Sequence, residues 1–99
     1  MDEQLIQALR QVIDPELRMN IVDLGLVYSA EMIDDGQAEV AMTLTAPGCP
    51  LAGMLTEMAE AAIWRQVPGA KSVRVRLVWS PPWQPSMMSD VAKEELGWD

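Results

Sequence analysis

The chain begins with a hydrophobic pattern that is typical of an amphipathic helix. Apolar residues recur at helical spacing on one face, and the acidic Asp2 and Glu3 suit the positive end of a helix. Pro15 disfavours the α conformation at Asp14, so we predict a helix from about Asp2 to Ile13. The apolar face comprises Leu5, Ile6, Leu9, Val12 and Ile13.

Two runs with strand-like patterns come next, after a structured loop predicted over Pro15–Leu24. They predict β-strands at Leu26–Ile33 and Ala38–Thr45. The intervening segment, Asp34–Gln37, contains Asp-Gly, which is a strong signal for a tight turn, so the two strands should form a hairpin. In the second strand apolar residues alternate with others, which indicates one buried face and one more polar face.

The second half of the chain returns to a helical period and then to strand alternation. A helix is predicted over Pro50–Val67, ended by Pro68, and a third strand over Ser72–Trp79. A stiff, proline-containing tail then leads to a short helix that Ser86 caps and that ends at about Leu96. The apolar stripe of the long helix comprises Leu51, Met54, Leu55, Met58, Ala62 and Ile63.

These elements follow the order helix, strand, strand, helix, strand, helix, which predicts an α+β fold. A hairpin followed by a helical crossover gives a small mixed three-stranded sheet with helices packed on one face. A length of 99 residues fits one domain that spans positions 1–99.

Composition narrows the classes of function. Fifteen acidic and seven basic residues give a net charge of −8, so we expect no nucleic acid partner. No apolar run is long enough for a membrane span, and the acidic start lacks the basic region of a secretory signal, so we expect a cytoplasmic location. The chain has no histidine and one cysteine, which excludes Cys–His and Ser–His dyads and an internal disulfide.

The single cysteine, Cys49, is the first candidate for chemistry. It lies in Pro-Gly-Cys-Pro, between the end of a predicted strand and the start of a predicted helix. A helix N-terminus carries about +0.5 elementary charge, which favours the reactive thiolate form. The alternative is a small buried apolar residue, as many free cysteines are. The flanking Pro47-Gly48 and Pro50 favour the functional interpretation, because the prolines tie the loop to one shape and the glycine lets the backbone approach closely.

Acidic residues in the first loop are the second candidate. Asp14, Glu16 and Asp23 lie close together in the sequence, beside a proline. Such a cluster can bind a hard cation, position a cation of a partner, or cap helices and turns. Thr45 shortly precedes Cys49, and its hydroxyl either points into the same pocket or closes the strand.

A segment rich in tryptophan and proline is the third candidate. Trp79 and Trp83 flank two adjacent prolines, and they form either a rigid wall across the core or a docking surface for a partner. Met87 and Met88 are expected to fill gaps in the core. The alternative is that the thioether sulfurs of these two methionines lie near Cys49 and bind a soft metal with it.

Six blocks of the sequence carry a family resemblance. The blocks are Asp14–Glu16, Asn20–Val27, Thr43–Pro50, Val78–Trp83, Met88–Ser89 and Leu96–Gly97. In this order, and covering nearly the whole chain, they resemble the small iron–sulfur cluster assembly domain of SufT-like and PaaD-like maturation factors. The chain ends at Asp99 without the cysteine-rich C-terminal module of PaaD-like members, so the resemblance favours the short SufT-like form.

The resemblance also implies a set of site residues and a cargo. The residues that would line the site are Asp14, Glu16, Thr45, Gly48 and Pro50. Cys49 would be the functional thiol and the metal ligand. One thiolate cannot hold a cluster alone, because common clusters take four protein thiolates or nitrogen substitutes. We therefore expect a labile iron–sulfur cluster, shared with another chain or a small thiol and not bound tightly by one chain.

Three functions follow from these observations. Our prediction is an accessory factor in iron–sulfur cluster assembly or transfer, which carries iron or cluster transiently or escorts client apoproteins through Cys49, without enzymatic turnover. Its partners would be the assembly machinery and clients, and a homodimer is one source of further ligands. The second function is a metal-free adaptor that docks partners through Trp79 and Trp83. The third is a thiol enzyme, whose sulfur a carboxylate or the helix dipole would activate.

Overall fold

The predicted hairpin is present in the computed structural model, which describes residues 1–45 and 52–97. β3 (Val27–Ile33) pairs antiparallel with β4 (Gln37–Met42). The turn between them, η1 (Asp34–Gly36), places Asp35 at a φ of 63° and Gly36 at a φ of 84°. An Asp-Gly pair tolerates these left-handed values, which explains why the predicted turn forms here.

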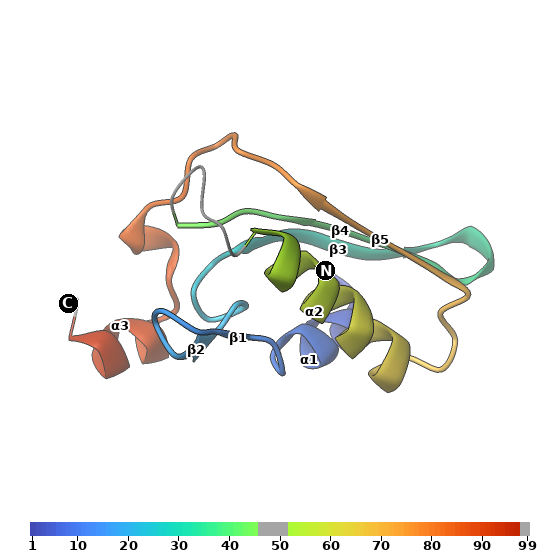
Figure 1. Ribbon diagram of the computed structural model, residues 1–99, viewed down its shortest axis with the longest axis horizontal. Coiled ribbons are helices and arrows are strands. Elements are labelled where there is room, and N and C mark those ends of the chain that lie inside the picture. Colours follow the sequence, from blue (N-terminus) through green and yellow to red (C-terminus); the bar gives the residue numbers. More distant parts are fainter. Residues whose placement is uncertain (46–51, 98–99) are drawn as a thin grey trace.

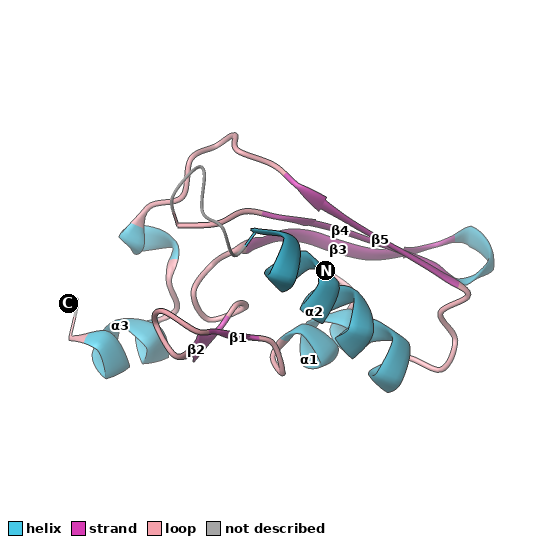
Figure 2. Cartoon of the chain, viewed as in Figure 1, coloured by secondary structure: helices cyan, strands magenta, loops and turns pink. Residues whose placement is uncertain are grey.

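The third strand completes a mixed sheet. α2 (Ala52–Gln66) carries the chain back along the hairpin, and β5 (Ser72–Leu77) then pairs parallel with β4. The strand order is β3-β4-β5, and the predicted α+β class is confirmed (Figure 2). β5 ends before the predicted limit at Trp79, although Val78 still donates its N–H to the carbonyl oxygen of Met42 at 2.9 Å.

One face of the sheet is covered by α1 (Glu3–Leu9) and α2, which lie side by side (Figure 1). Burial of one large apolar side chain contributes about 1.5–3 kcal/mol, so this layer is the main source of stability. Met54 departs from the predicted apolar stripe of α2, because 39% of its surface is exposed. Among the described residues, no helix is both long enough and apolar enough to cross a bilayer. The most deeply buried large side chains include Leu5, Leu9, Ile21, Leu24, Leu26, Met42, Leu55 and Ile63.

The predicted N-terminal helix is too long, because α1 ends at Leu9. Beyond it, the carbonyl oxygen of Val12 accepts the N–H of Ile21 at 3.0 Å. β1 (Ile13–Asp14) then pairs antiparallel with β2 (Met19–Asn20), so part of the predicted loop forms a second, two-stranded sheet. Backbone pairing with a segment further along the chain outweighs the helical spacing here.

The last helix is capped by Ser89 and not by the predicted Ser86. Ser86 lies in a 3₁₀ turn, η2 (Pro85–Met87), whereas the hydroxyl oxygen of Ser89 accepts the N–H of Ala92 at 3.1 Å. α3 (Asp90–Leu96) therefore begins later than predicted, and it lies away from the sheet face that α1 and α2 cover (Figure 1). The backbone N–H of Ser89 is also bound by the loop before β3, and this contact selects between the two serines.

Candidate functional site

Asp14, the first of the predicted site residues, caps a turn. Only 5% of its surface is exposed. Its carboxylate oxygen Oδ1 accepts the N–H of Glu16 at 2.8 Å and the N–H of Leu17 at 3.1 Å, and its carbonyl oxygen accepts the N–H of Arg18 at 2.7 Å. Asp14 therefore fixes the loop between β1 and β2 and leaves the Glu16 side chain exposed at its tip.

Asp23 belongs to a polar network that joins three parts of the chain. Its carboxylate accepts hydrogen bonds from Asn20 Nδ2 at 2.8 Å and from Arg10 Nη1 at 3.1 Å. Its backbone carbonyl oxygen accepts the N–H of Ser89 at 2.8 Å. Burial raises the pKa of Asp23, but hydrogen bonds from Asn20, Arg10 and Ser89 and the Arg10 charge outweigh it, so the pKa lies below its ordinary value.

The predicted thiol lies outside the described residues, as do Gly48 and Pro50. Thr45 is half-buried, beyond the end of β4. Over the described parts of the chain, the backbone N–H of Glu16 binds the Asp14 carboxylate, but no hydrogen bond or ion pair joins Thr45 to either residue. The same parts contain no group of three or more His, Cys, Asp and Glu side chains that could hold a metal ion.

A buried threonine, Thr43, is a feature that the sequence analysis missed. Its side chain is fully buried, and its hydroxyl oxygen Oγ1 has no hydrogen-bond partner within the described residues. A buried hydroxyl without a partner costs roughly 1–3 kcal/mol, so the position is unusual for a threonine. The pattern of the predicted strand assigned Thr43 to a more polar face, and nothing in that pattern indicates its burial.

The two candidate tryptophans have different environments. The indole Nε1 of Trp83 donates to the carbonyl oxygen of Leu24 at 2.7 Å, and its ring packs against the core. Trp79 is 43% exposed. Of the two interpretations left open by the sequence, the wall across the core fits Trp83, and the docking surface stays a prediction for Trp79.

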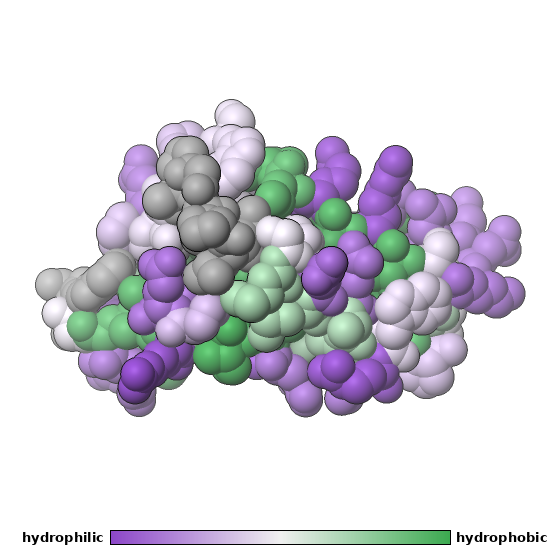
Figure 3. Space-filling model, in the orientation of Figure 1, coloured by the Kyte–Doolittle hydropathy of each residue, from purple (hydrophilic) through white to green (hydrophobic). Residues whose placement is uncertain are grey.

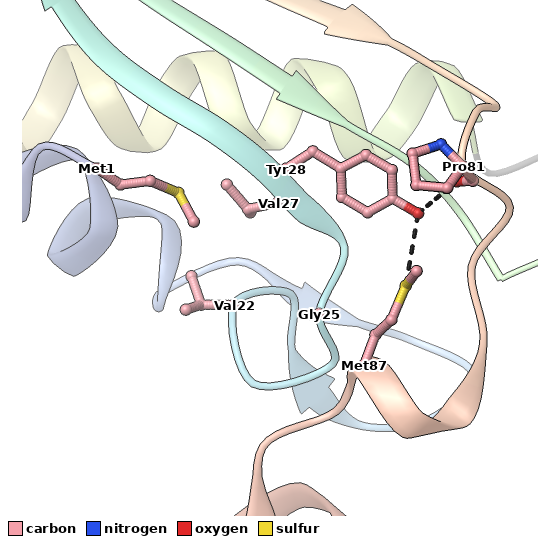
Figure 4. A pocket seen from close by; sticks show the side chains of 7 residues that line it. All are labelled: Met1, Val22, Gly25, Val27, Tyr28, Pro81 and Met87. Atoms are coloured by element: carbon pink, nitrogen blue, oxygen red, sulfur yellow. Dashed lines mark hydrogen bonds between the residues drawn. The ribbon is translucent and has the colours of Figure 1, made fainter.

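An open groove of about 590 Å³ lies where the tail crosses the start of β3 (Figure 4). Tyr28 ties two parts of the lining together, because its hydroxyl donates to the carbonyl oxygen of Pro81 at 2.7 Å and lies 3.6 Å from the Met87 sulfur. A Cβ atom on Gly25 would overlap the carbonyl oxygen of Met87, so glycine is required for this close approach. The groove is lined by Met1, Val22, Gly25, Val27, Tyr28, Pro81 and Met87.

The groove brings together residues from distant parts of the sequence. Val22, Gly25 and Val27 belong to one block of the family resemblance, and Pro81 belongs to another. Of the two predicted core methionines, Met88 is buried, whereas Met87 lines the groove. Two residues could have signalled this site in the sequence: Gly25, directly after the predicted loop, and Tyr28, the single tyrosine of the chain.

A family model described as "Iron-sulfur cluster assembly protein" matches residues 2–77. The chain belongs to this family. The match covers more than half of the chain, and it confirms the family predicted from the sequence blocks.

Members of the iron–sulfur cluster assembly family resemble this chain over most of its length. The "Fe-S protein maturation auxiliary factor YitW" of Bacillus subtilis is 45% identical over 96% of this chain and 92% of its own length. The "Iron-sulfur cluster carrier protein" of Mycobacterium bovis is 42% identical over 90% of this chain, which corresponds to 21% of that longer protein. A crystal structure from Bacillus anthracis, titled as a domain of unknown function, superposes with a TM-score of 0.91 at 40% identity, over 96% of this chain and 90% of that one.

Proposed function

We propose that this chain is an auxiliary factor in the maturation of iron–sulfur proteins. The observation that carries the proposal is the family match over residues 2–77, together with a Bacillus subtilis relative of similar length that is named as such a factor. We further propose that the whole chain acts as one domain in the cytoplasm. Its partners are the assembly machinery and client apoproteins, and it performs no enzymatic turnover.

The cargo is iron or an iron–sulfur cluster, held through Cys49. Because Cys49 is the single cysteine of a chain without histidine, it supplies at most one of the usual ligands of a cluster. The remaining ligands come from a second chain, a small thiol or the client. Incomplete ligation makes the cluster labile, and lability suits transfer from carrier to client. A relative named as a cluster carrier supports this part of the proposal.

The residues proposed to line the cargo site come from two loops. Asp14 holds the β1–β2 loop through its two backbone contacts, and this leaves the Glu16 carboxylate exposed for a hard cation or a partner. Thr45 lies beyond the end of β4, where the chain leads toward Gly48, Cys49 and Pro50. In this arrangement Asp14 positions its neighbours, and Glu16 and Thr45 offer oxygen atoms to the cargo site.

Anaerobic reconstitution with iron and sulfide tests the cargo. We expect wild-type protein to develop a visible chromophore and a matching mass increase in native mass spectrometry, and Cys49→Ser to develop neither. Trp79→Phe is the matched control, because it alters an exposed side chain and should retain the chromophore. A colourless wild-type protein that still binds its client would overturn carriage. A client that matures normally with Cys49→Ala in depleted cells would overturn the role of the thiol.

A metal-free adaptor is the second candidate function. The observation that favours it is the exposure of Trp79, because an exposed tryptophan is typical of interface anchors. An adaptor would lose client binding in Trp79→Ala and keep it in Cys49→Ser, which reverses the pattern expected for carriage.

A thiol enzyme would require a Cys49 pKa clearly below the ordinary value near 8.5, which alkylation rates across pH would measure.

A further inference from the structure

The outer edge of β5 is an unpaired strand edge in the described part of the chain. β5 is the last strand in the order β3-β4-β5, and β4 lies on its other side (Figure 1). An edge strand presents free backbone N–H and C=O groups, which are a ready template for a further strand. This edge lies apart from the groove and from the β1–β2 loop, which come from other elements.

The two faces of β5 differ in character. Val73, Val75 and Leu77 are half-buried and pack against the core. Arg74 and Arg76 are exposed on the opposite face, which α1 and α2 do not cover. Residues two apart along a strand lie about 7 Å from one another on the same face. The two guanidinium groups therefore form a short basic row beside the free backbone edge.

This basic row stands out in an acidic chain. Arg74 and Arg76 are two of the seven basic residues of a chain with a net charge of −8. The ion pairs found in the described residues join Met1 to Glu31 and Arg10 to Asp23, so neither arginine of β5 takes part. Figure 3 shows hydrophilic side chains projecting from the molecule on the side where the strands lie. Arg74 lies in register with Glu39 of β4 without forming an ion pair, whereas Arg76 lies in register with Ala41. Both guanidinium groups are thus unpaired within the described residues, and Arg76 has no acidic register partner on β4.

We propose that the free edge of β5 binds an extended acidic segment of a partner protein by strand addition. Backbone hydrogen bonds would supply affinity, and carboxylates at alternate positions of the added strand would face Arg74 and Arg76. Charge complementarity favours this occupant over a second copy of the chain, because an antiparallel β5–β5 pair would place like charges together. The negative remainder of the surface repels an acidic segment, so the segment is directed to this edge. The proposal does not depend on Cys49.

Charged residues on edge strands also protect proteins against unwanted pairing. Protection alone requires that no strand bind here, so binding of a model peptide distinguishes the two roles. The probe is a fluorescein-labelled peptide of about eight residues in which glutamate and valine alternate. A peptide with lysine in place of glutamate is the control for charge.

Fluorescence anisotropy at low salt measures the binding. We expect wild-type protein to bind the glutamate peptide and not the lysine peptide, and salt to weaken the binding. The double variant Arg74→Glu/Arg76→Glu should lose about tenfold or more in affinity and gain binding of the lysine peptide. Arg65→Glu/Lys93→Glu makes the same change in net charge elsewhere and should stay within about twofold of wild type. Arg74→Lys/Arg76→Lys should keep most of the affinity.

Amide hydrogen exchange locates the peptide. We expect slower exchange at β5 residues when the glutamate peptide is added, and unchanged exchange in β3, which lies at the opposite edge of the sheet. Absence of binding to wild type would overturn the proposal, as would equal loss in both double variants or protection confined to other elements. A third outcome is that wild type binds no peptide while the Arg74→Ala/Arg76→Ala variant self-associates. In that case the arginines would serve only to protect the edge of β5 against unwanted pairing.

Discussion

The two ends of the three-stranded sheet are built in different ways. At the end where β3 begins, the loop before it and the C-terminal tail are joined by contacts between residues far apart in the sequence. Trp83 binds the Leu24 carbonyl oxygen, and Tyr28 binds that of Pro81. At the opposite end, β3 and β4 are joined by the local turn η1, and one further bond runs from the Lys71 N–H to Gly36 at 2.7 Å.

This difference follows the distribution of the sequence blocks that carry the family resemblance. Among the described residues, the blocks that carry the family resemblance include the loop before β3, positions 43–45 after β4 and the tail after β5, and these belong to the first end. A hairpin turn needs only residues that tolerate its backbone angles. Packing two loops and a tail against one another requires particular side chains at each contact, and such residues form a recognisable motif. Apart from Gly36, where an added Cβ would overlap the Gly69 carbonyl oxygen, substitutions at the motif end should therefore cost more stability than those at the hairpin end.

The largest effect is expected at Gly25. Its φ of +77° is unfavourable for other residues, and a Cβ would overlap the Met87 carbonyl oxygen. Gly25→Ala should lower the free energy of unfolding by about 3 kcal/mol, measured by urea denaturation with tryptophan fluorescence. Gly69→Ala is the control, since a Cβ there meets no atom within 4 Å. Equal losses in the two variants would contradict the close approach of tail and loop.

The next effect is expected at Asp23. Asp23→Asn replaces a charged acceptor of bonds from Asn20 and Arg10, so it should cost about 2 kcal/mol at pH 7. The exposed Arg10 side chain contributes little of this, because solvent screens it.

The pKa of Asp23 is lowered in the folded state, so its contribution is fully present above the unfolded-state pKa and is lost as pH falls through the folded-state pKa. The stability difference between wild type and Asp23→Asn should therefore be constant near pH 7 and shrink below about pH 4. Urea denaturation at several pH values measures it, with the exposed Asp34→Asn as the control. A difference that grows toward low pH would show that Asp23 does not act through its charge.

A smaller effect is expected at Trp83. Trp83→Phe removes the bond from the indole Nε1 to the Leu24 carbonyl oxygen while keeping an aromatic ring, so it should cost about 1 kcal/mol. Trp79→Phe changes an exposed ring and should stay within about 0.5 kcal/mol of wild type. Thermal unfolding followed by circular dichroism compares them. A larger loss for Trp79→Phe would reverse the roles assigned to the two tryptophans.

The smallest effect is expected in the hairpin turn. Asp34 is exposed and takes part in none of the ion pairs found in the described residues. Asp34→Ala should change the free energy of unfolding by no more than about 0.5 kcal/mol in urea denaturation. A loss comparable with that of Gly25→Ala would remove the distinction between the two ends.

Local sequence signals predicted much of the fold correctly. The Asp-Gly turn, the strand alternation on both sides of it and the helical stripe of α2 placed the sheet and its crossover within a few residues. The errors lie where a distant contact competes with a local signal. Val12 and Ile13 have helical spacing, but pairing with Ile21 and Asn20 draws them out of the helix.

The candidate site was less predictable for the same reason. The place of Asp14 in the site stays a prediction, and its hydrogen bonds to the N–H groups of Glu16 and Leu17 show the capping role that the sequence left open. The burial of Thr43 and the groove around Tyr28 were missed, because each depends on what the tail or a neighbouring strand covers. No pattern within one segment contains that information.

The sequence by itself determined the family, the α+β class and the restriction of thiol chemistry to Cys49, because motifs, periodicity and residue counts are local properties of the chain. Only the tertiary structure decided which serine caps α3, which tryptophan packs inward and that β5 is the last strand in the order β3-β4-β5. These features arise when segments far apart in the sequence meet, and the free energy of such contacts exceeds the small preferences of each segment alone.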